Sequence, residues 1–171
     1  MIIEHLDLSD VVLVGHSYGG GVVIGAADRV PERIAHAVFL DALLPQDGQA
    51  VMDLEGTEEL KSMAVEDGWL LVFPEPPPGA PRQPSRGQPI GTLEEKLRLT
   101  LPIERRAFRR TYVKAGGNPP TPAYKRTGNF WNAAERVRFD PAWRYFELPA
   151  NHGLHREMPE VVAAILLSIV E

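Results

Sequence analysis

Short runs of apolar residues alternate along the chain with segments of helical periodicity. Apolar runs lie at 11–14 and 34–40, further strands are expected at 110–114 and 143–148, and helices are expected at about 19–29, 123–138 and 159–171. Such short apolar runs are typical of strands that are buried on both faces of a sheet. Helical crossovers between strands give parallel pairing. The pattern therefore predicts the α/β class, with a mostly parallel sheet and helices on both of its faces.

The segment 45–107 breaks this alternation. A helical stretch is expected at 56–69 and another around 93–97, and residues 73–84 between them are rich in proline. Each proline removes a backbone donor and fixes its own φ, so this passage cannot form a helix or a central strand. A disordered linker is one interpretation. Because helical material flanks the prolines, we expect 45–107 to be a cap inserted into a single domain of residues 1–171.

The composition limits the classes of protein to which the chain can belong. Its 171 residues carry a formal net charge of -5 and include no cysteine. The acidic balance argues against nucleic-acid binding, and the absence of cysteine excludes disulfides and suits the cytoplasm. The N-terminus lacks a signal-peptide pattern, and the longest apolar stretch, 161–170, is far shorter than the roughly 20 residues that span a bilayer. We expect a cytoplasmic globular protein with no membrane or nucleic-acid partner.

The first apolar run ends at a Gly-x-Ser-x-Gly motif, Gly15-His16-Ser17-Tyr18-Gly19. Between a strand and a helix, this motif holds the serine in a strained turn with its hydroxyl exposed above the sheet. We expect small residues at 15 and 19, because larger ones would collide with the adjoining strand and helix. The amide of Tyr18 begins the helix and is expected to donate to a developing oxyanion. A glycine-rich turn with an ordinary surface serine is the alternative.

With this motif in its context, the chain resembles the α/β-hydrolase family, in its serine-esterase branch. The resemblance implies an enzyme that cleaves small carboxylic esters, with Ser17 as the nucleophile and without a cofactor or metal. Two alternatives stay open. One is a lyase or carbon–carbon hydrolase that uses the same site, and the other is a catalytically silent fragment that serves as a binding module.

A serine nucleophile needs a base, and five histidines compete for this role. His152 and His155 share the loop after the last expected strand, which resembles the catalytic-histidine loop of the family. His152 has the position of the family's base, and Glu157 and Pro159 follow it at the usual spacing. Asn151 stands where the family normally has glycine, and His155 is the alternative base. A metal site built on His152, His155 and Glu157 lacks a further ligand set, so no metal is expected.

The base in turn needs a partner that holds its tautomer. In the family, this acid usually lies in the loop after the penultimate strand, here 115–122, which has no carboxylate and carries Asn118 at the expected place. Some members carry the acid at the end of the strand after the nucleophile helix, where Asp41 stands. We expect Asp41 to complete the triad within about 3 Å of the His152 ring. A turn role for Asp41, with Asn118 on the imidazole, is the alternative.

Members of the family have several strands before the nucleophile strand, whereas residues 1–10 here resemble only the last turn of a helix. We therefore expect an N-terminally truncated hydrolase whose first strand has an open edge. Such an edge favours aggregation or a homodimer. The oxyanion hole is expected to hold the Tyr18 amide alone, which would leave little activity.

Overall fold

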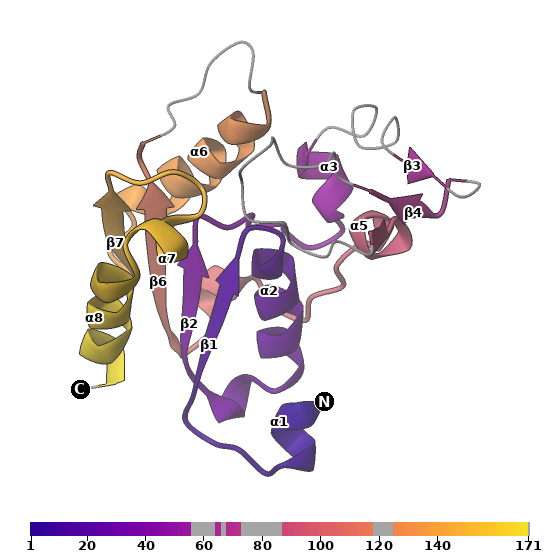
Figure 1. The fold of residues 1–171 in the computed structure, drawn as a ribbon. Coiled ribbons are helices and arrows are strands. Elements are labelled where there is room, and N and C mark those ends of the chain that lie inside the picture. Colours follow the sequence, from indigo (N-terminus) through magenta and orange to yellow (C-terminus); the bar gives the residue numbers. More distant parts are fainter. Residues whose placement is uncertain (56–63, 66–67, 73–86, 118–124, 171) are drawn as a thin grey trace.

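The computed structural model describes residues 1–55, 64–65, 68–72, 87–117 and 125–170. Four parallel strands form its main sheet in the order β1-β2-β6-β7 (Figure 1). They are β1 (Val11–His16), β2 (Ile34–Leu40), β6 (Arg109–Ala115) and β7 (Trp143–Leu148). The helices around this sheet are α1 (Ile2–His5), α2 (Gly19–Arg29), α6 (Lys125–Arg138), α7 (Leu154–Glu157) and α8 (Pro159–Val170), with 3-10 turns at Pro31–Arg33 and Ile103–Arg105. The predicted fold class is confirmed.

Side chains of β2 alternate between two apolar cores, as expected for a strand covered on both faces. Ala37 and Phe39 pack with residues of α2 and α6 on one face, whereas Val38 and Leu40 pack with residues of α8 on the other. Figure 1 shows α8 and α2 on opposite sides of the sheet. The two helical layers therefore leave the carboxyl ends of the strands as the edge at which loops gather.

The register aligns these carboxyl ends. Leu40 of β2 pairs with His16 of β1 and with Val113 of β6, and Val113 pairs with Phe146 of β7. The turns after β1 and β2, the end of β6 and the loop after β7 consequently meet at one edge of the sheet. In open α/β sheets this is the edge where ligands bind.

Strand β1 lies at the side of the main sheet. Within the described residues, only β2 pairs with it. Val14 is 40% exposed, and Val11, Val12 and Leu13 are only partly buried. The prediction that this strand is buried on both faces is therefore wrong, because the described elements cover it incompletely.

A second, smaller sheet lies within 45–107. It is antiparallel, in the order β3-β4-β5. The elements of this segment are α3 (Val51–Glu55), β3 (Ala64–Val65), β4 (Leu70–Leu71), β5 (Gln88–Pro89) and α5 (Gly91–Glu94).

The helix predicted at 56–69 is wrong over 64–65, which pair as a strand with 70–71. Strands of two residues are too short to produce a periodic pattern in the sequence. The helix expected around 93–97 corresponds to α5, which ends at Glu94. Residues 56–63 and the whole proline-rich stretch 73–84 lie outside the described residues. Among the helices that the structure describes, none combines the length and the apolar character that crossing a membrane requires.

Candidate active site

Ser17 lies in the tight turn between β1 and α2. Its φ of 57° is in the left-handed region, which a residue other than glycine occupies only where its surroundings hold it. The Ser17 amide donates to the carbonyl of Leu40 at 3.3 Å, and its own carbonyl accepts from the amide of Leu43 at 3.1 Å. The connection after β2 therefore fixes the strained turn from outside.

Two glycines make this turn possible. A Cβ atom at Gly15 would lie 2.6 Å from the carbonyl oxygen of Gly19, and one at Gly20 would collide with the carbonyl oxygen of Leu43. A Cβ atom at Gly19 would meet no described atom within 4 Å. The expectation of crowding at Gly19 is therefore wrong. The crowded position after the serine is Gly20, because α2 begins against the connection that follows β2.

His152, in the loop between β7 and α7, bridges Ser17 and Asp41. Its Nε2 atom lies 2.8 Å from Ser17 Oγ, and its Nδ1 atom lies 2.7 Å from Asp41 Oδ2. When Nδ1–H donates to the carboxylate, Nε2 is free to accept the serine proton, which is the tautomer that a general base needs. The structure thus brings together the three side chains that the sequence selected, at the separation expected between Asp41 and the imidazole. Asn118 lies outside the described residues.

The Asp41 carboxylate is buried, with 3% of the residue exposed. Its backbone also has a positive φ, 39°. Besides His152, it accepts hydrogen bonds at Oδ1 from Lys114 Nζ at 2.6 Å and from the amide of Ala115 at 3.3 Å. Burial alone raises the pKa of the Asp41 carboxyl, but the hydrogen bonds from His152 and Lys114 and the ammonium charge outweigh it and hold the pKa below its usual range. Asp41 is therefore a carboxylate at neutral pH.

Lys114 is a residue of this site that the sequence did not identify, as is Phe130, described below. Lys114 lies at the end of β6, and its side chain is 2% exposed. The signal that could have found it is a single lysine within the apolar run Tyr112-Val113-Lys114-Ala115, since a lysine is almost never fully buried without a partner.

Of two further histidines, His16 packs against the base and His155 packs against His16. His16 Nε2–H donates to the backbone carbonyl of His152 at 2.7 Å, and the two rings are 4.6 Å apart. The ring of His155, the alternative base, lies 4.6 Å from that of His16. Burial lowers the pKa of both His16 and His155. Among the described residues, no group of three or more histidine, cysteine, aspartate or glutamate side chains could hold a metal ion.

An apolar wall lies beside the imidazole. The ring of Phe130, on α6, is 4.5 Å from the His152 ring. Phe130 belongs to a buried cluster against which Tyr18 packs, and the other buried members are Leu43, Val51, Met52, Leu71 and Leu93. The hydroxyl of Tyr18 donates to the carbonyl of Thr92 at 3.2 Å, which ties the serine turn to α5. The segment 45–107 therefore contributes apolar surface next to the serine turn.

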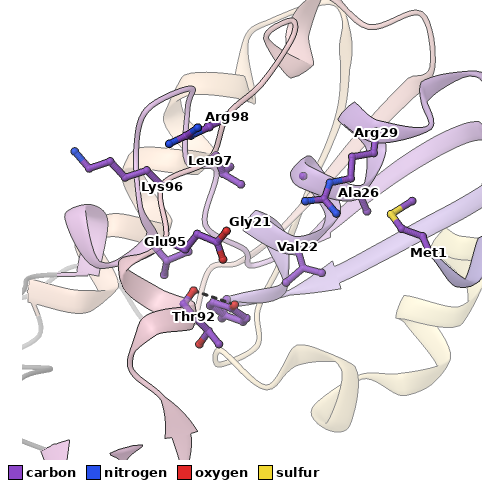
Figure 2. A pocket seen from close by; sticks show the side chains of 13 residues that line it. Met1, Gly21, Val22, Ala26, Arg29, Thr92, Glu95, Lys96, Leu97 and Arg98 are labelled. Atoms are coloured by element: carbon purple, nitrogen blue, oxygen red, sulfur yellow. Dashed lines mark hydrogen bonds between the residues drawn. The ribbon is translucent and has the colours of Figure 1, made fainter. Parts of the chain in front are cut away.

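Tyr18 also borders a hollow of about 740 Å³ between α2 and the segment 92–98 (Figure 2). Val22 and Arg29 of α2 line one wall, and Lys96 lines the other. None of the three hydrogen-bonded residues Ser17, His152 and Asp41 lines this hollow. It is thus separate from the arrangement around the imidazole.

A serine in the turn after a parallel strand, with a histidine after the last strand, defines the class of α/β-type hydrolases. The chain belongs to the alpha/beta hydrolase family, whose model matches residues 2–165.

Two esterases share similar segments with this chain. The Carbendazim hydrolyzing esterase of Nocardioides sp. (strain SG-4G) is 52% identical over 52 residues, which are 30% of this chain and 22% of that protein. The Putative methylesterase 12, chloroplastic, of Arabidopsis thaliana is 41% identical over 58 residues, 33% of this chain and 17% of that protein. The matched segments therefore span about a fifth of the length of these relatives.

Solved structures match nearly the whole chain. An extracellular α/β-hydrolase from a Paenibacillus species, described as sharing homology with Tobacco Salicylic Acid Binding Protein 2, has a TM-score of 0.68 at 24% identity, over 98% of this chain and 75% of that one. A pyrethroid hydrolase from Sphingobium faniae JZ-2 has a TM-score of 0.69 at 20% identity, over 98% of this chain and 74% of that one. At these identities the likeness establishes the fold.

Proposed function

We propose that this chain is a serine carboxylesterase that cleaves small esters through Ser17, His152 and Asp41. One observation carries the proposal. The imidazole of His152 lies 2.8 Å from the Ser17 hydroxyl on one side and 2.7 Å from the buried Asp41 carboxylate on the other. A serine in a strained turn, joined to a base that a carboxylate orients, is the arrangement that nucleophilic ester cleavage requires.

In the proposed reaction, His152 Nε2 takes the hydroxyl proton while Ser17 Oγ attacks the ester carbonyl carbon. Asp41 stabilises the imidazolium that forms, and the Tyr18 amide, at the N-terminal end of α2, donates to the oxyanion. The imidazolium then protonates the departing alcohol, which leaves an acyl group on Ser17. A water molecule, deprotonated by His152, attacks this acyl group and releases the carboxylic acid.

The apolar wall supports a substrate with an apolar or aromatic group next to its ester. The Phe130 ring lies 4.5 Å from the imidazole, and a cluster of buried apolar side chains packs around Phe130. The names of the relatives, methylesterases and an esterase that hydrolyses carbendazim, support small esters of this kind. We propose 45–107 as a cap whose buried apolar side chains pack against Phe130. The absence of cysteine supports a cytoplasmic location.

A fluorophosphonate label followed by peptide mass spectrometry tests the proposal. We expect the label on Ser17, and we expect Ser17→Ala to abolish both labelling and hydrolysis of p-nitrophenyl acetate while leaving the thermal midpoint nearly unchanged. His152→Ala should be as damaging as the serine change, and His155→Ala much milder. An unlabelled parent protein would favour a silent binding module, whereas a labelled protein that hydrolyses no ester would favour lyase chemistry.

A further inference from the structure

Lys114 is a buried cation with a complete set of partners. Its Nζ atom donates to Asp41 Oδ1 at 2.6 Å and to the carbonyl of Ala115 at 2.8 Å, and it lies 4.5 Å from the centre of the Trp131 ring. A buried ammonium is strongly unfavourable unless it is paired in this way. The protein thus maintains a positive charge on the far side of the carboxylate that holds the base.

The two oxygens of Asp41 have different partners. Oδ1 accepts from Lys114 and from the amide of Ala115, whereas Oδ2 faces His152. With Oδ1 occupied, the carboxylate plane is fixed and Oδ2 points at the imidazole. Among the described contacts, those of Lys114 reach neither Ser17 nor the imidazole, so its influence passes through Asp41.

We propose that Lys114 is a positioning residue of the triad. It orients the Asp41 carboxylate towards His152 and offsets part of the negative charge of Asp41. His152 can therefore act as a base at lower pH than it could beside Asp41 alone. This inference rests on the proposed function. The sign follows from electrostatics. A carboxylate stabilises the protonated imidazole, and an ammonium beside the carboxylate weakens that effect. Loss of Lys114 would therefore keep the base protonated, and inactive, to higher pH.

The other ionisable groups around the pair do not carry this charge. His16 from β1 faces the base, His155 from α7 packs against His16, and burial lowers the pKa of each, which favours their neutral forms. Tyr112 of β6 has its pKa raised by burial and stays neutral. Lys114 thus supplies the fixed positive charge that contacts Asp41 directly.

Two substitutions separate charge from hydrogen bonding. Lys114→Met removes both, and Lys114→Gln keeps a donor but no charge. We would measure the rate of Ser17 inactivation by a fluorophosphonate from pH 4.5 to 9. We expect the acid-side midpoint of this profile to rise by about one pH unit in both variants, and the plateau rate to fall further in Lys114→Met. Arg136→Met is the matched control, because it removes a cation that contacts the Leu44 carbonyl and leaves Asp41 untouched.

A second readout requires no catalysis. The titration of the His152 ring, followed by proton NMR and assigned with His152→Ala, should shift upward by a similar amount in the Lys114 variants. If the parent is not labelled yet this titration still shifts, the proposed function fails, and what stands is only the effect of the Lys114 charge on the imidazole. Unchanged midpoints in both measurements would overturn the inference and leave Lys114 with a purely structural role. If Lys114→Met does not fold, the milder Lys114→Gln decides the question.

Discussion

Acid should destabilise this protein through one buried histidine outside the active site. His36 on β2 is 1% exposed, and its Nε2 atom is 2.8 Å from the Oγ1 atom of Thr111. Burial, together with the smaller effect of the charges of Arg109, Arg144 and Arg110, lowers the pKa of His36 from 6.5 to about 4. The folded protein therefore keeps a neutral imidazole at pH values where the unfolded chain protonates it.

The size of the effect follows from proton linkage. Between pH 6.5 and about 4 the unfolded chain binds one proton more than the folded protein at this residue, so stability falls as the pH falls. Each pH unit in this window changes the free energy of unfolding by up to about 1.4 kcal/mol. Across the window, His36 should account for a loss of about 3 kcal/mol. Above pH 6.5 its contribution is constant.

Urea unfolding at pH 7, 6, 5 and 4.5, followed by tryptophan fluorescence, measures this loss. We expect His36→Gln, which keeps a neutral polar group beside Thr111, to lose less stability than the parent as the pH falls. Carboxylates titrate in the same range, so the informative quantity is the difference between the two proteins. Thr111→Val is the control, because it removes the hydrogen bond but keeps the imidazole, and it should retain the slope of the parent. Equal slopes for the parent and His36→Gln would refute the reasoning.

Two further predictions concern the triad and the sheet edge. Asp41→Asn should lower ester turnover by about 10⁴-fold, and should destabilise the protein by about 3–5 kcal/mol because it leaves the Lys114 ammonium buried without its counter-charge. Adding Lys114→Met should restore much of the stability but not the turnover, and recovery of both, by kinetics and thermal unfolding, would contradict the triad role. We also propose that β1 mediates self-association, so Val14→Lys should lower the mass measured by light scattering. Val22→Lys is the control, because Val22 lies on α2 and is 55% exposed, so this substitution should leave the measured mass unchanged. An equal decrease in mass for both variants would argue against self-association through β1.

The sequence predicted the elements that have strong periodic patterns. Ile34–Leu40 and Trp143–Leu148 form strands with the predicted bounds, because both are short segments dominated by apolar residues and flanked by turns and helical segments. The short elements were not predictable. The strand at 64–65 and the four-residue helix α7 depend on tertiary pairing and not on local pattern.

The residues of the candidate site differ in the same way, because some stand in local motifs and others depend on tertiary contacts. Ser17 and His152 stand in recognisable local motifs, so their positions were predictable from the chain alone. Asp41 was selected by its place at a strand end, and its contact with His152 depends on the sheet register. Lys114 has no motif at all. Its role depends on the pairing of β6 with β2, which a single sequence does not display.

The ion pair between Lys114 and Asp41 can form only when the strands of the main sheet pair in the correct register. Ser17, Asp41, Lys114 and His152 follow one another along the chain in the order in which β1, β2, β6 and β7 lie across the sheet. A slip of β6 by one residue would turn Lys114 to the opposite face and leave two buried charges apart, at a cost of about 3–5 kcal/mol. The misaligned sheet would thus be destabilised at the place where the candidate site would also be disrupted. The same residues that form the candidate site would therefore also favour the correct strand register during folding.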